Sequence, residues 1–307
     1  MPTKKNFACS IVALFLGTAC DATPRPLTTT RPGVMKVFVT IAPQSYFVKR
    51  VGGDRVDVGI LVGPGQSHHS YEPTPRQIQE LSSARVFFRI GLPIERGLID
   101  KIQSSIGDLR IIDTSQGVRL RDAAEACHEE GHDHSHEGSK DPHIWLDPKL
   151  VMLQARNIRD GLCAVAPEHR AEFDANLKAF EADLTALDGK LTQVLAPLKG
   201  REFFVFHPAY GYFADAYGLK QVAVEEEGKE PSMKRIDSLI NRAKQAGVKL
   251  IFVQPQFPTA GAKIIADAIG GAVVPLDPMA VDYLSNMESM AREVSKALGQ
   301  SREATRG

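Results

Sequence analysis

Residues 167–198 read PEHRAEFDANLKAFEADLTALDGKLTQVLAPL and form the most regular segment of the chain. Its apolar residues recur at alternating gaps of four and three, which places them on one face of an α-helix. Because Pro197 should end this helix, we expect about 30 residues, or about 45 Å at 1.5 Å per residue. A coiled-coil arm would show the same spacing. The apolar positions are Phe173, Leu177, Phe180, Leu184, Leu187, Leu191, Val194 and Leu198.

Short apolar segments lie on both sides of this helix and alternate with segments of helical periodicity. Near-continuous apolar runs are typical of parallel strands that helices cover on both faces. We therefore predict an α/β fold of two lobes, each with a four-stranded, mostly parallel sheet, joined by one long rigid helix. The predicted strands are 37–42, 56–62, 85–90 and 110–113 before the helix, and 202–206, 221–225, 249–254 and 272–276 after it.

The ends of the intervening helices are marked by capping residues. Thr74-Pro75-Arg76-Gln77 has the pattern of a capping box with proline at the first helical position. Asp147 and Ser232 are candidate N-caps. The predicted units are an N-terminal lobe over 36–166, a linker helix over 167–197 and a C-terminal lobe over 198–302.

Composition narrows the class of protein. The 307 residues are 43% hydrophobic and 24% charged, as in ordinary globular proteins of about two domains. Lys+Arg and Asp+Glu balance at 37 each, so no strong field favours a nucleic-acid partner, and we expect none. The chain has no GxxxxGK[ST] phosphate loop, and its HExxH match, residues 128–132, falls in a His-rich stretch and not in a predicted helix, so we expect no enzyme of those kinds.

The N-terminus has the features of a signal peptide over residues 1–20. Two lysines precede an apolar run, 7–16, that is too short to span a membrane. Gly17-Thr18-Ala19-Cys20 then resembles a lipoprotein processing site, with Cys20 lipidated; ordinary cleavage after a small residue is the alternative. Residues 21–35 are expected to form a flexible tether. Both alternatives place the protein in the periplasm or on the outer face of the cytoplasmic membrane.

Four candidate metal ligands lie at or just beyond the carboxyl ends of predicted strands. Ligands of open parallel sheets bind at the carboxyl ends of the strands. These residues are His69, His143, His207 and Asp277. Three imidazoles and a carboxylate suit zinc and fill a tetrahedral shell, whereas catalytic zinc keeps an open position. This set of ligands therefore favours a protein that holds a metal over one that uses it in catalysis. It disfavours manganese as the bound ion and does not exclude copper or nickel.

Each candidate also has a structural interpretation. An isolated histidine is more often structural than a ligand, and Asp277 before Pro278 could be a turn residue. His68 adjoins His69, but one of two adjacent residues usually points elsewhere. His169 is expected to be exposed, and 225–227 (EEE) to be a solvated loop.

A His-rich loop, 127–140, lies within the N-terminal lobe. Its glycine, serine and charged residues argue against packed structure, and it is a candidate auxiliary zinc-capturing loop. Cys127 could be a free thiol, a ligand or a disulfide partner of Cys163, although Cys163 is most simply a core residue. The auxiliary candidates are His128, His132, His134 and His136.

Five motifs, in this order, resemble the metal-binding lipoproteins of bacterial ABC importers, the ZnuA- and TroA-like family. The resemblance implies metal in a cleft between the lobes and delivery to a membrane permease that a separate ATPase powers. It implies the ligands His69, His143, His207 and Asp277, with histidine at 207 favouring zinc over manganese. A manganese protein, an adhesin of the same family and, less favoured, a secreted zinc hydrolase are the alternatives. The motifs are His69-Ser70-Tyr71-Glu72-Pro73, Asp141-Pro142-His143-Ile144-Trp145-Leu146-Asp147-Pro148, His207-Pro208-Ala209-Tyr210-Gly211-Tyr212-Phe213, Glu227-Gly228-Lys229-Glu230-Pro231-Ser232 and Leu276-Asp277-Pro278.

Overall fold

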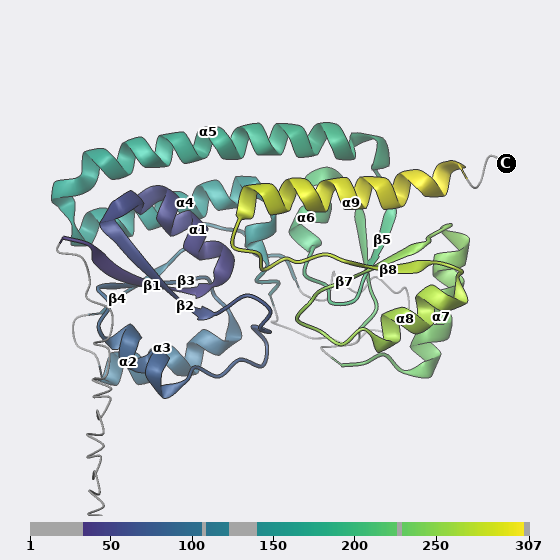
Figure 1. Ribbon diagram of the computed structural model, residues 1–307, viewed down its shortest axis with the longest axis horizontal. Coiled ribbons are helices and arrows are strands. Elements are labelled where there is room, and N and C mark those ends of the chain that lie inside the picture. The colour runs from purple at the N-terminus through teal and green to yellow at the C-terminus, as the bar shows by residue number, and fades with distance from the viewer. Residues whose placement is uncertain (1–32, 106–108, 123–139, 226–228, 304–307) are drawn as a thin grey trace, which may run out of the picture.

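The computed structural model describes residues 33–105, 109–122, 140–225 and 229–303, and these form two α/β lobes side by side (Figure 1). The predicted signal peptide, most of the tether and nearly all of the His-rich loop lie outside the described residues. The predictions for Cys20, Cys127, His128, His132, His134 and His136 therefore stay predictions.

Each lobe is built on one four-stranded parallel sheet, as the sequence predicts. The strand order is β2-β1-β3-β4 in the first lobe and β6-β5-β7-β8 in the second, so both lobes repeat the same topology. Register in the first sheet is fixed on both sides of Val37, which pairs with Val58 and Val86. The strands are β1 Met35–Ile41, β2 Val56–Val62, β3 Val86–Arg89, β4 Arg110–Asp113, β5 Glu202–Val205, β6 Lys220–Ala223, β7 Leu250–Val253 and β8 Ala272–Pro275.

Helices cover the sheets and begin where the sequence predicts. The Thr74 side chain accepts a hydrogen bond from the Gln77 backbone, Asp147 from Lys149, and Ser232 from Arg235, so all three are N-caps. The helices are α1 Ala42–Gly52, α2 Pro75–Ser82, α3 Pro93–Ser105, α4 Pro148–Val165, α5 Arg170–Leu195, α6 Gly211–Tyr217, α7 Met233–Gln245, α8 Ala260–Ala268 and α9 Tyr283–Glu303.

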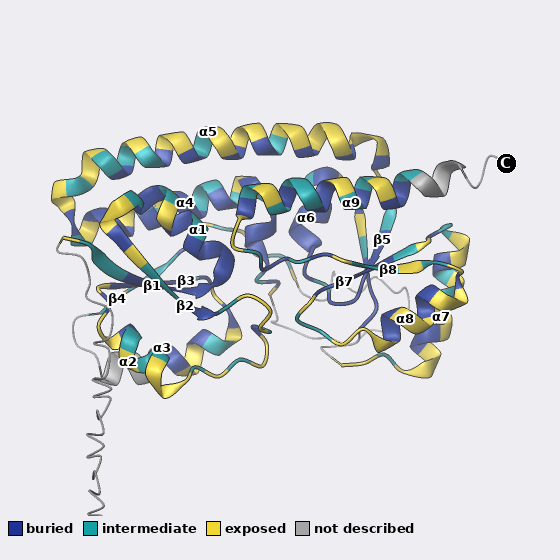
Figure 2. Cartoon of the chain, in the orientation of Figure 1, coloured by how far each residue is buried: buried dark blue, intermediate teal, exposed yellow. Residues whose placement is uncertain are grey.

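The long helix α5 runs along both lobes and packs on α1, α4 and α9 (Figure 1). The buried residues of α5 form a stripe that faces the rest of the molecule (Figure 2). They match the predicted positions as far as Leu191, but in the last turn Leu195 is buried and Val194 is 36% exposed. The predicted position of Val194 on that face is therefore wrong, because the buried face continues from Leu191 to the residue four positions on, not three. Helix α5 ends at Leu195 and passes into the short 3₁₀ turn Ala196–Leu198. Phe180 anchors the middle of α5 through ring contacts with Tyr46 and Phe47, each at 6.0 Å.

A second helix also joins the lobes. The C-terminal helix α9 lies beside α5 and its first residue, Tyr283, meets Phe47 of the first lobe edge to face at 4.9 Å. The Trp145 indole donates to the Pro278 carbonyl at 2.7 Å, and the Tyr212 hydroxyl donates to the Asp141 carbonyl at 2.9 Å. One hydrophobic core therefore continues from the first sheet, beneath α5, to the second.

Within the described residues, the helices are all too short or too polar to cross a lipid bilayer.

Candidate metal centre

Four histidines from three separate segments meet between the lobes. His68 and His69 lie in the loop after β2, His143 precedes the 3₁₀ turn Ile144–Leu146, and His207 follows β5. One ring nitrogen from each lies within 4.8 Å of the others, and this is the one such group of metal-binding side chains in the described ranges. The carboxyl edges of the two sheets thus share a nitrogen-rich site, where ligands of parallel sheets bind.

The Nε2 atoms are spaced as a small metal ion requires. Separations are 3.2 Å between His68 and His143, 3.4 Å between His143 and His207, and 2.9 Å between His207 and His69. A tetrahedral ion with metal–nitrogen bonds of about 2.0–2.1 Å would place its ligand atoms about 3.3–3.4 Å apart. The 3.2 Å and 3.4 Å contacts therefore lie near the edge length of a zinc tetrahedron, and the 2.9 Å contact is shorter than that edge.

Buried carboxylates orient two of the rings. The Nδ1–H of His143 donates to Asp141 Oδ1 at 2.7 Å, and that of His207 donates to Glu225 Oε1 at 2.7 Å. Because a carboxylate accepts, both Nδ1 atoms carry the hydrogen and both Nε2 atoms present a lone pair to the centre. Such outer partners fix the tautomer and raise the basicity of metal-binding histidines.

His207 is held on three further sides. Its backbone N–H donates to Gln254 Oε1 at 3.1 Å, and Gln254 Nε2 donates back to its carbonyl at 2.6 Å. The ring of Phe257 stacks on the imidazole with centroids 4.5 Å apart and 18° between planes. Gln254 follows β7, so strand β7 positions a ligand that strand β5 supplies.

Burial favours the neutral form of His68, His69 and His207, which is the form of imidazole that binds metal. Burial, with repulsion from His207 and His143, lowers the pKa of His69 to about 3. Burial also lowers the pKa of His68 well below its ordinary value. For His207, burial lowers the pKa and outweighs the opposing effect of the hydrogen bond that the ring donates to Glu225.

The structure places three of the four predicted ligands together. His69, His143 and His207 converge, and His68 joins them, so the expectation that His68 points elsewhere is wrong. Asp277 is not a member of the group. Its Oδ1 accepts hydrogen bonds from Gln256 Nε2 at 2.7 Å and from the Met279 backbone at 2.9 Å.

Two functional residues were missed by sequence reasoning. The sequence predicts a solvated loop at Glu225, but this residue is buried beside His207, so the prediction is wrong there. Asp141 begins the motif at residues 141–148, and the sequence does not predict its role, which is to orient His143. A positional signal was available for Asp141, which lies two residues before a candidate ligand, whereas the run of three glutamates after β6 does not show that Glu225 turns inward.

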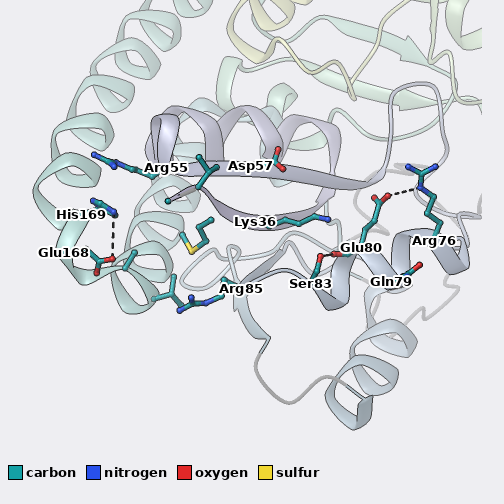
Figure 3. Close-up of a pocket in the computed structure, with 15 residues that line it drawn as sticks. Lys36, Arg55, Asp57, Arg76, Gln79, Glu80, Ser83, Arg85, Glu168 and His169 are labelled. Atoms are coloured by element: carbon teal, nitrogen blue, oxygen red, sulfur yellow. Dashed lines mark hydrogen bonds and ion pairs between the residues drawn. The ribbon is translucent and has the colours of Figure 1, made fainter. Parts of the chain in front are cut away.

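A cavity of about 620 Å³ lies at the opposite, amino-terminal edge of the first sheet (Figure 3). Lys36, Arg85 and His169 line it together with several acidic side chains. Its ion pairs are local, Arg76 with Glu80 at 2.9 Å and His169 with Glu168 at 3.9 Å, and they do not converge on one point. This cavity is therefore separate from the metal centre.

Cys163 is buried in α4 with a free thiol, and burial raises its pKa. This agrees with a small core residue.

Two α/β lobes of repeated topology, a long helix along both, and a histidine centre between them define a solute-binding protein for a metal ion. Residues 37–297 match the family of the zinc-uptake complex component A, periplasmic, and the chain belongs to this family. Members of this family are components of a transport complex and are not enzymes.

Three relatives illustrate the likeness. The chain is 30% identical over 297 residues to the zinc-binding lipoprotein AdcA of Streptococcus pneumoniae, covering 94% of this chain and 56% of that protein. It is similar to a crystal structure of ZnuA, with 38% identity, a TM-score of 0.80, and coverage of 86% and 99%. It is also similar to the laminin-binding protein Lmb of Streptococcus agalactiae, with 26% identity, a TM-score of 0.75, and coverage of 86% and 99%. The chain spans about half the length of the AdcA proteins that it matches.

Proposed function

We propose that this protein captures Zn²⁺ outside the cytoplasm and delivers it to an ABC-type membrane permease that a separate ATPase powers. One observation carries the proposal: ring nitrogens of four histidines lie within 4.8 Å of one another between the lobes. Membership of a zinc-uptake family and the likeness to the zinc-binding lipoprotein AdcA support it.

The chemistry of the donors supports zinc as cargo. Imidazole suits zinc, whereas manganese prefers oxygen-rich shells. Four protein ligands leave no position for the activated water that a zinc hydrolase needs, so the site is suited to holding the ion. His69, His143 and His207 are the proposed ligands that the sequence predicts and that also converge in the structure. For the fourth ligand, the candidate predicted from the sequence is Asp277.

The proposed route begins at the membrane surface. Lipidation at Cys20 would attach the protein there through the tether, in the periplasm or on the outer face of the cytoplasmic membrane. The His-rich loop, with His128, His132, His134 and His136, would gather zinc near His143. Both elements rest on the sequence alone.

Elemental analysis of protein purified without chelator tests the function. We expect about one zinc per chain, and expect a His207→Ala variant to lose it, because that change removes a ligand of the tetrahedral shell. His169→Ala is the matched control, since it removes a histidine outside the cluster. A wild-type protein without bound zinc, or a His207→Ala protein that retains it, would contradict the proposal. Copper and nickel are measured in the same samples.

An adhesin is the second candidate. The similar Lmb protein is described as bifunctional, with adhesin and metal-transporting activity. Binding of the purified protein to immobilised laminin, with and without zinc, tests this candidate; absence of binding in both conditions rejects it.

A further inference from the structure

We propose that His68 is the fourth zinc ligand, so that four imidazoles form the shell and Asp277 remains outside it. This inference rests on the proposed zinc-binding function and specifies the chemistry of the same site. It replaces a three-histidine, one-carboxylate shell with one made only of nitrogen.

The position of the His68 ring supports the assignment. Its Nε2 atom lies 3.2 Å from that of His143, which is within about 0.2 Å of the edge of a zinc tetrahedron. Trp145 meets the ring edge to face, with centroids 5.9 Å apart. The ring is thus packed in place with one nitrogen toward the centre.

Burial of His68 points to a ligand. The residue is 2% exposed, and its Nδ1 atom is buried with no hydrogen-bond partner. Buried polar side chains almost always have hydrogen-bond partners, so a ring whose polar contact is only with another imidazole requires an explanation. A cation at the centre would be bound by the Nε2 atom and would supply the missing polar partner. The missing outer acceptor makes His68 a weaker ligand than His143 or His207, whose Nδ1 atoms bind carboxylates.

Asp277 has a different task in the structure. Its carboxylate accepts from Gln256 and from the Met279 backbone, and its carbonyl accepts from Asn286 Nδ2 at 2.8 Å. These bonds shape the turn after β8, the structural role that an aspartate before proline also suggests.

Two buried carboxylates other than Asp277 lie beside the ligand rings. Four neutral imidazoles bring no charge, and a dication adds two positive charges. Asp141 and Glu225, 4% and 3% exposed, each accept a hydrogen bond from a ligand ring and supply two negative charges. Buried charge is tolerated when it is compensated in this way. The all-nitrogen shell should also bind manganese poorly.

X-ray absorption at the zinc edge of the loaded full-length protein tests the proposal directly. We expect the wild-type spectrum to show four imidazoles and no carboxylate. His68→Ala should lose one imidazole and bind zinc more than about tenfold more weakly in a chelator competition, because losing a ligand should cost at least as much as losing the group that orients one. Asp277→Asn should keep the wild-type spectrum and affinity.

Other outcomes overturn the assignment. Three imidazoles and a carboxylate that disappears in Asp277→Asn would make Asp277 the fourth ligand. Three imidazoles with no change in either variant would leave the fourth position to water. In both cases the zinc-binding function stands, whereas a wild-type protein that takes up no zinc contradicts that function itself. The wild-type spectrum decides the question even if the His68→Ala protein does not fold.

Discussion

At the scale of single residues, the second nitrogen of each histidine shapes the metal centre. Asp141 and Glu225 bind Nδ1 of His143 and His207 and so turn the Nε2 lone pairs inward. His143 and His207 therefore present fixed, basic ligands, while His68 and His69 come from one loop and have no carboxylate partner among the described residues. The sequence predicted three of the four converging histidines because they follow strand ends. It could not predict Glu225, because nothing in a run of three glutamates shows which one turns inward.

Replacing the outer carboxylate of His207 should weaken zinc binding without emptying the site. We expect Glu225→Gln to lower zinc affinity by about 10–100-fold, because the ring loses the acceptor that fixes its tautomer. Competition with a chromophoric chelator measures this. Glu230→Gln is the control for the same charge change at an exposed glutamate. Equal affinities for wild type and Glu225→Gln would show that this hydrogen bond does not support the site.

Acid should destabilise the zinc-free protein through its histidines. The pKa of His69 is about 3 in the folded state, against an ordinary value of 6.5. Between these values the unfolded state binds a proton that the folded state does not. The free energy of unfolding therefore falls as the pH drops from 6.5 toward 3. Above pH 6.5, His69 is neutral in both states and causes no such loss of stability.

Urea unfolding of chelator-treated protein between pH 7.5 and 4.5 checks this expectation. His69→Gln should lose less stability over this range than wild type, because its side chain cannot titrate. His169→Gln, outside the cluster, should follow the wild-type curve more closely. Identical pH profiles for wild type and His69→Gln would contradict the account.

At the scale of elements, α5 acts as the cover of a shared core. Its apolar spacing predicted the buried face correctly up to Leu191, and the capping residues predicted the starts of α2, α4 and α7. Local signals of this kind depend on a few neighbouring residues, so a single sequence reveals them. The role of α9 could not be predicted in the same way, because its contact with Phe47 joins residues 236 positions apart.

Truncation of a central α5 side chain should be costly. Phe180 is fully buried against Tyr46 and Phe47, so we expect Phe180→Ala to lower the free energy of unfolding by about 3–5 kcal/mol. Lys178→Ala, at an exposed position of the same helix, should change it by no more than about 0.5 kcal/mol. Chemical denaturation measures both. A loss at Phe180 no larger than that at Lys178 would mean that α5 is not packed as described.

At the scale of the whole molecule, the two lobes form one packed body. Helix α5 spans both lobes, and α9 begins between them and lies beside α5 (Figure 1). The Trp145–Pro278 and Tyr212–Asp141 hydrogen bonds join the lobes. The sequence predicted two parallel sheets and a connecting helix. It did not show that the lobes also share a hydrophobic core, because burial across an interface leaves no periodic pattern of its own.

This shared core should limit motion on metal loading. We expect solution scattering profiles of the zinc-free and zinc-loaded protein to superimpose, since hinge closure would have to break contacts in the continuous core. Trp145→Phe, which removes the indole donor to Pro278 but keeps an aromatic ring, should permit a larger difference between the two states. A clear decrease in the radius of gyration of the wild-type protein on adding zinc would contradict a rigid junction.

Diffraction from crystals grown with zinc, measured on both sides of the zinc absorption edge, tests the central claim most directly. We expect one strong anomalous peak between the lobes, bonded to the Nε2 atoms of His69, His143 and His207. A zinc-free centre, or a peak bound elsewhere with these three nitrogens unligated, would contradict it.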